Sequence, residues 1–127
     1  MDRNQLIHQI GSKLVQDIGG RKKDWDRFAI VGEIEQDQTS MAGFWYDKHG
    51  EHEAVAPKDF TVLDDLAELR NAMAHVDRKP PWVACLIQVV RASGSIDFQF
   101  EYENAKRWAI TFKNGDERAK EIRPDKD

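Results

Sequence analysis

A run of nine residues near the middle of the chain places the strongest limit on its fold. The run Trp82-Val-Ala-Cys-Leu-Ile-Gln-Val-Val90 is largely apolar in both phases of a strand. Because the side chains of a strand alternate between the two faces of a sheet, both faces of this strand must be covered. The sequence therefore predicts a central strand, whose second face is covered either by a helix or by an oligomer contact.

The next segment predicts a strand of the opposite kind, with one apolar and one polar face. One face carries Ile96, Phe98, Phe100 and Tyr102, and the other carries Asp97, Gln99, Glu101 and Glu103. This strict alternation is typical of a strand that covers a core on one side only. The acidic face is expected to remain open, in contrast to both faces of the preceding strand.

Further alternation predicts strands elsewhere in the chain. One covers residues 25–35, where Gly32 interrupts the apolar phase as at a bulge. An aromatic strand over 41–46 and a short return strand over 53–55 are joined by the turn residues Asp47-Lys48-His49-Gly50, which predicts a hairpin. Trp108, Ile110 and Phe112 predict one more short strand or an ordered extension.

Two helices follow from apolar residues spaced three and four apart. The first covers about residues 3–18 and ends at Gly19-Gly20, and the second covers about residues 60–77. Thr61 precedes Asp64 by three residues, which favours a capping box. Acidic side chains in this region could form an acid/base or metal cluster, but they also complement the helix dipole, which is the interpretation we prefer: Asp64, Asp65 and Glu68.

These elements predict an α+β fold, in which an N-terminal and a middle helix pack on a mainly antiparallel sheet of five or six strands. A chain of 127 residues has room for one such domain, 1–127. From about residue 114 the sequence becomes a charged C-terminal tail, with a helical turn up to Ile122.

The net charge of −4 is unevenly distributed. Residues 1–32 carry +2, residues 33–104 carry −8 and residues 105–127 carry +2. The acidic middle section would repel nucleic acid and anionic lipid, and it would attract a basic protein surface. The single cysteine, Cys85, excludes an internal disulfide, and the chain contains neither a signal-peptide pattern nor a long apolar segment. We therefore expect a cytoplasmic protein without direct nucleic-acid or membrane binding.

Signatures of catalysis are scarce. The chain lacks a phosphate-binding glycine loop, a Gly-x-Ser-x-Gly motif and a Cys-x-x-Cys motif. His49 and His52 lie near two glutamates, so a metal-dependent hydrolase centred on them is one hypothesis, although the spacing is not a standard zinc spacing. Cys85 lies in an apolar strand, where burial raises a thiol pKa. We expect no enzymatic activity, no cofactor and no bound metal.

The acidic row Asp97, Glu101 and Glu103 has three interpretations: a plain solvent-facing row, a catalytic carboxylate group, or a docking surface for a basic protein. The hairpin could extend a docking surface into a continuous acidic patch with Glu33, Glu35, Asp47, Glu51 and Glu53. Trp45 and Tyr46 are candidate aromatic anchors for a partner, provided that they are not buried in the core.

The order of these motifs resembles that of the YezG-like immunity proteins. The resemblance covers most of residues 5–112 and departs from the family at Ser93-Gly94, where an Asp-Gly turn is usual. It is carried by an amphipathic N-terminal helix, a strand beginning near Trp25, the hairpin Phe44-Trp45-Tyr46, a helix with Leu66 and Leu69, the strand start Pro81-Trp82, the strand Phe98 to Tyr102, and the later motifs Arg107-Trp108 and Ile122-Arg123-Pro124.

This resemblance implies an α+β antitoxin of a polymorphic or contact-dependent inhibition system. Such a protein binds and blocks the C-terminal domain of a cognate bacterial toxin, commonly a nuclease. The family has no catalytic residues to transfer, and its interface residues vary with the toxin. The alternative is a small adaptor or regulatory subunit that binds another basic protein.

Overall fold

The computed structural model describes residues 1–36 and 38–125. Five strands form one antiparallel sheet in the order β3-β2-β1-β4-β5, which confirms the predicted α+β fold. The central strands are β1 and β4, and the edges are β3 and β5. The bounds are β1 (Arg27–Glu35), β2 (Gln38–Tyr46), β3 (His52–Val55), β4 (Ala84–Val90) and β5 (Ser95–Glu101).

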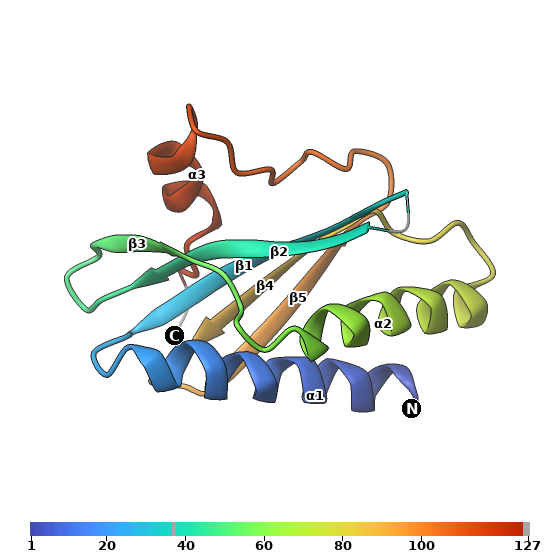
Figure 1. Cartoon of the computed structure of the whole chain (residues 1–127), viewed down its shortest axis with the longest axis horizontal. Coiled ribbons are helices and arrows are strands. Elements are labelled where there is room, and N and C mark those ends of the chain that lie inside the picture. Colours follow the sequence, from blue (N-terminus) through green and yellow to red (C-terminus); the bar gives the residue numbers. More distant parts are fainter. Residues whose placement is uncertain (37, 126–127) are drawn as a thin grey trace.

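Helices cover both faces of this sheet (Figure 1). On one face lie α1 (Arg3–Leu14), its π-helical continuation η1 (Val15–Gly19) and α2 (Thr61–Asp77). On the other face lies α3 (Gly115–Ile122), which the chain reaches through a long connection after β5. None of the described helices combines the length and apolar character needed to cross a membrane.

Two apolar clusters lie on opposite sides of the sheet. The larger cluster joins the sheet to α1 and α2 and includes Phe28, Leu66 and Trp82. The smaller one joins the sheet to the C-terminal segment: Ala29, Val31, Phe44, Tyr46, Ala84, Leu86, Trp108, Ala119 and Ile122. The second face of β4 is therefore covered by the chain's own C-terminal segment, and the predicted charged tail contains a helix that completes the core.

Three local predictions are wrong. Of the two alternatives predicted for residues 108–112, the strand is wrong: the segment is an extension that follows turns, in which Trp108 is buried and Phe112 is fully exposed. Gly32 is not a bulge, since its pairing with both neighbouring strands is continuous; instead, a Cβ there would lie 2.6 Å from Leu66 Cδ2. Finally, α2 is not capped by Thr61 and Asp64.

Carboxylates hold the starts of α1 and α2, although only α1 has a side-chain N-cap. At α1, Asp2 accepts a hydrogen bond from the Gln5 N–H, and the Gln5 side chain accepts one from the Asp2 N–H, which is a complete capping box. At α2, the Asp59 carboxylate accepts hydrogen bonds from the N–H and the hydroxyl of Thr61. Asp65, from the predicted acidic cluster, instead forms an ion pair with Lys13 of α1 at 2.6 Å.

Candidate functional site

The acidic row on β5 is shorter than predicted. Asp97 and Glu101 lie on the α3 side of the strand, but β5 ends at Glu101 and Glu103 lies in the following bend. The Glu101 carboxylate accepts hydrogen bonds from the N–H groups of Glu103 and Asn104 and pairs with Arg107 at 3.0 Å. These contacts, the Glu103 N–H first, lower the pKa of Glu101. Glu101 therefore shapes this bend, whereas Asp97 and Glu103 are exposed and have no ion pair among the described residues.

The hairpin acids are also used within the fold. Asp47 accepts hydrogen bonds from the N–H groups of His49 (2.8 Å) and Glu51 (3.0 Å), which closes the β2–β3 turn. Glu53 pairs with Lys22 at 3.0 Å, and this contact lowers the pKa of Glu53. Of these acids, only the exposed Glu51 has a carboxylate with no hydrogen bond or ion pair among the described residues.

The two acidic groups do not form the continuous patch expected from the sequence. The hairpin and β5 are at opposite edges of the sheet, four strand spacings or about 19 Å apart. They also face opposite sides, because Glu53 is paired with Trp45 on the α1/α2 side while Asp97 is paired with Gln88 on the α3 side. Between them, Glu33 and Glu35 both pair with Lys106, at 3.2 and 3.4 Å.

Trp45 and Tyr46 are not surface anchors. Their exposed fractions are 6% and 1%, because adjacent residues of β2 point into the two different cores. Lys22 Nζ lies 4.8 Å from the Trp45 ring centroid, and the Tyr46 hydroxyl donates a hydrogen bond to the Ala119 carbonyl. Burial raises the pKa of Tyr46. Trp45 therefore packs between the sheet and the α1/α2 layer, and Tyr46 packs between the sheet and the C-terminal segment.

The residues considered for catalysis are dispersed. His52 Nε2 lies 3.2 Å from Asp116 Oδ1 of α3, and His49 lies in the β2–β3 turn. Within residues 1–36 and 38–125, no three His, Cys, Asp or Glu side chains are placed to hold a metal ion. Cys85 is fully buried on β4, and burial raises its pKa to about 12.

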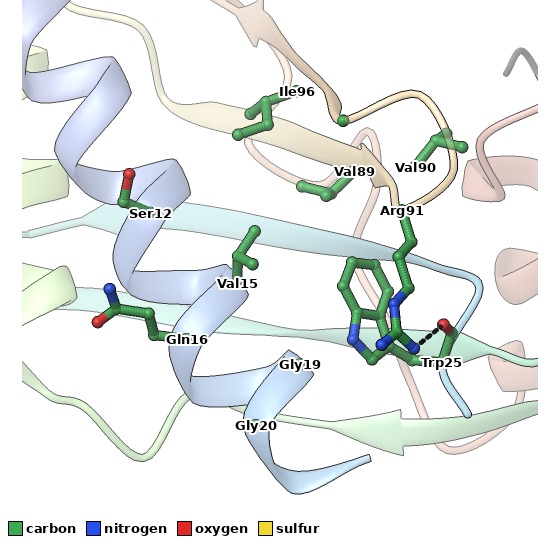
Figure 2. Close-up of a pocket in the computed structure, with 11 residues that line it drawn as sticks. Ser12, Val15, Gln16, Gly19, Gly20, Trp25, Val89, Val90, Arg91 and Ile96 are labelled. Carbon is green, nitrogen blue, oxygen red and sulfur yellow. Dashed lines mark hydrogen bonds between the residues drawn. The ribbon is translucent and has the colours of Figure 1, made fainter. Parts of the chain in front are cut away.

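An open groove of about 710 Å³ lies between η1 and the start of β5 (Figure 2). Val15, Val89 and Ile96 form apolar walls, and Trp25 lies across one end. The guanidinium of Arg91 is 5.2 Å from the Trp25 ring centroid and donates hydrogen bonds to the carbonyls of Lys23 (2.7 Å) and Trp25 (3.1 Å). The groove wall is therefore fixed by a stacked aromatic and cationic pair.

Two glycines allow the groove to form. A Cβ at Gly19 would lie 2.8 Å from Trp25 Nε1, and a Cβ at Gly11 would lie 2.9 Å from Ile96 Cδ1. The absence of side chains at these positions lets the N-terminal helix approach Trp25 and β5. The sequence predicts Gly19 only as the end of the first helix. It does not predict the groove, because the walls of the groove come from four separate segments of the chain.

This groove is suited to holding an apolar side chain. Among its described lining residues there is no carboxylate, imidazole or thiol, so its chemistry is apolar contact together with hydrogen bonding by Ser12, Gln16 and the Arg91 guanidinium. It opens where β5 begins, and the exposed Asp97, the residue after Ile96, points to the opposite face of the sheet.

No protein-family model and no curated protein matches the chain, so its resemblance to the YezG-like immunity proteins stays a prediction.

Proposed function

We propose that the chain is an immunity protein that binds a cognate bacterial toxin domain in the cytoplasm and blocks it by occlusion. The proposed toxin domain has a basic surface of the kind that a nuclease presents to phosphates. The observation that carries the proposal is the apolar groove at the start of β5, together with the exposed Asp97 on the same edge strand. The groove opens on the α1/α2 side of the sheet and the Asp97 side chain lies on the α3 side, so a partner that contacts both must bind around this end of the sheet edge.

Such a surface has the two components that an occluding inhibitor needs. An apolar pocket supplies affinity, because buried anchor side chains dominate the binding free energy of protein interfaces. An acidic side chain on the same edge strand accelerates association with a basic partner and helps to select it. A nuclease inhibitor needs no reacting groups of its own, since covering the phosphate-binding surface is sufficient to exclude substrate.

The experiment that tests this function is co-expression. The toxin domain encoded beside this chain is expressed in bacteria alone and together with the chain, and growth and DNA or RNA integrity are measured. We expect toxicity from the domain alone, rescue by the chain, and a complex that contains the two proteins in equal numbers. A toxin domain that still kills in the presence of the folded chain would contradict the proposal.

Two pairs of variants locate the site. Asp97→Lys is expected to slow association several-fold at low salt, while Glu68→Lys on the exposed side of α2 makes the same charge change elsewhere and is expected to leave association unchanged. Ser12→Trp fills the groove and should speed dissociation at any salt concentration, whereas Ser12→Ala leaves the groove open. Equal binding by all four variants would place the interface elsewhere.

A further inference from the structure

The edge strand β5 has an unpaired side. It is the outermost strand next to β4, and no described strand lies beyond it (Figure 1). Over its seven residues the pairing with β4 is continuous, and the strand contains no proline, lysine or bulge, which are the features that normally protect a sheet edge. The opposite edge, β3, is only four residues long and carries the ion-paired Glu53.

The direction of the backbone groups of β5 follows from hydrogen bonds at the ends of β4. The Val83 carbonyl accepts from the Ile34 N–H, and the Arg91 N–H donates to the Asp26 carbonyl, so the odd-numbered residues of β4 face β1. Val83, which precedes β4, also donates its N–H to the Glu101 carbonyl, so the Glu101 carbonyl faces β4. The even-numbered residues of β4 must then face β5. Their partners in the register, whose backbone groups are used by β4, are Ser95, Asp97, Gln99 and Glu101.

The N–H and carbonyl groups of Ile96, Phe98 and Phe100 consequently point away from the sheet. The side chains of the same three residues lie on the α1/α2 side and are incompletely covered: Ile96 is 36% exposed, and Phe98 and Phe100 are half-buried. Unpaired backbone groups and uncovered apolar side chains thus occur at the same positions.

We infer that a second copy of the chain pairs with this edge, antiparallel, with a two-fold axis at Phe98. In this register Phe98 lies opposite Phe98 of the second copy, and Ile96 lies opposite Phe100. The three outward-facing residues of each copy then exchange about six hydrogen bonds. Two five-stranded sheets become one continuous sheet of ten strands, and the uncovered apolar side chains meet across the axis.

The side-chain pattern favours a second copy as the occupant because it is self-complementary. On the α3 side, Asp97 would lie opposite Gln99 and Glu101 would lie opposite Ser95, so no two like charges are directly opposed. The nearest like charges would lie on diagonals about 7–8 Å apart, where each Asp97 neighbours both Asp97 and Glu101 of the second copy. Dimerisation should therefore strengthen as salt rises, whereas binding of a basic toxin should weaken.

The inference goes beyond the proposed function and can be tested on the chain alone. Molecular mass is measured by analytical ultracentrifugation at increasing protein concentration, and amide hydrogen exchange is measured residue by residue. We expect the mass to rise from 14.7 kDa towards twice this value, more readily at high salt. The amides of Ile96, Phe98 and Phe100 should gain protection as concentration rises, whereas those of Asp97 and Gln99 should be protected throughout.

A pair of variants tests the strand contact itself. Phe98→Pro removes an N–H that β4 does not use and should keep the protein monomeric at every concentration. Phe98→Thr loses the same ring but keeps the N–H and a strand-forming side chain, so it should dimerise, only more weakly. Circular dichroism verifies that each variant is folded, and hydrogen exchange of the unaltered chain tests the contact even if Phe98→Pro fails to fold.

Three results would overturn the inference. One is a mass of 14.7 kDa at millimolar concentration with fast exchange at Ile96, Phe98 and Phe100, which would mean that the edge is free or reserved for a different partner. Another is a dimer in which these amides exchange as fast as in the monomer. The third is a folded Phe98→Pro variant that dimerises as the unaltered chain does.

Discussion

Gly43 is the position in the sheet where a side chain is least tolerable. Gly43 lies in β2, opposite Ile30 of β1. A Cβ at Gly43 would overlap the Ala29 carbonyl oxygen and lie 2.9 Å from Ile30 Cα. Backbone atoms between paired strands cannot move aside. Gly43→Ala should therefore lower the free energy of unfolding, measured by urea denaturation, by about 3 kcal/mol or more.

Gly20→Ala is the matched control for this prediction. Gly20 follows η1 with a φ of −70°, and nothing lies within 4 Å of a Cβ built on it. Alanine there restricts the unfolded chain without a clash, so stability should be unchanged or up to about 1 kcal/mol higher. Similar losses in both variants would show that the packing around Gly43 is looser than described.

Cys85 should be chemically silent in the folded protein. Its side chain is fully buried, and burial raises the pKa of the thiol to about 12. At pH 8 the reactive thiolate is then only about 10⁻⁴ of the population, and reagents have no access. A colorimetric disulfide reagent should leave the native protein unmodified for hours and modify it within minutes in guanidinium. Rapid reaction of the native protein would contradict this placement.

At the scale of the element, α2 depends on a carboxylate outside the helix. The hydroxyl and the N–H of Thr61 donate to Asp59, and these bonds lower the pKa of Asp59. A lowered carboxylate pKa contributes stability above the ordinary value of about 3.9, and that stability is lost as pH falls through the lowered value. Asp59→Ala should therefore lower the melting temperature at pH 7, and the difference should shrink as the pH falls below the ordinary value and Asp59 becomes protonated.

Asp64→Ala provides the comparison for this cap. Asp64 lies in the first turn of α2, is exposed and accepts no hydrogen bond among the described residues, so its loss should change the melting temperature little. Circular dichroism melts of both variants at pH 7 and pH 2 decide between the two caps. A larger loss for Asp64→Ala would restore the capping box that the spacing of Thr61 and Asp64 had predicted.

Most elements could be predicted because their periodicity follows from the face that they bury. The C-terminal segment could not, although Trp108, Ile110 and Phe112 alternate as in a strand. Its backbone forms local turns, from the Arg107 N–H to the Asn104 carbonyl and from the Ala109 N–H to the Lys106 carbonyl. An alternation of apolar residues with a period of two shows which side chains could share one face of a strand. It carries no information about whether a second strand lies beside the segment to form hydrogen bonds with it.

At the scale of the whole molecule, the charged segments neutralise one another. Lys106 and Arg107 from the basic C-terminal section pair with acids of the middle section, as do Lys13 and Lys22 from the N-terminal section. Counting charges along the chain could locate the acidic section but could not assign these partners, because they are distant in sequence. The candidate site is therefore smaller than the acidic section, and it includes a groove that no local pattern indicated.

The C-terminal segment is needed for the fold as a whole. Removing residues 105–127 would uncover one face of the central strands, including Val31, Phe44 and Leu86, and would remove the carbonyl that accepts the Tyr46 hydroxyl. We expect the truncated chain to bind an apolar dye, to aggregate on warming and to lack the cooperative thermal transition of the full chain.

A pair of point substitutions tests whether the defect comes from uncovering the sheet or from any change in the C-terminal segment. Ala119→Arg places a cation against the sheet at a fully buried position and should reproduce much of the defect of the truncation. Phe112→Ser alters a fully exposed side chain of the same segment and should leave the transition unchanged. If the truncated chain instead melted as sharply as the full chain, the sheet would be stable with one face open, and α3 would not be a necessary part of the core.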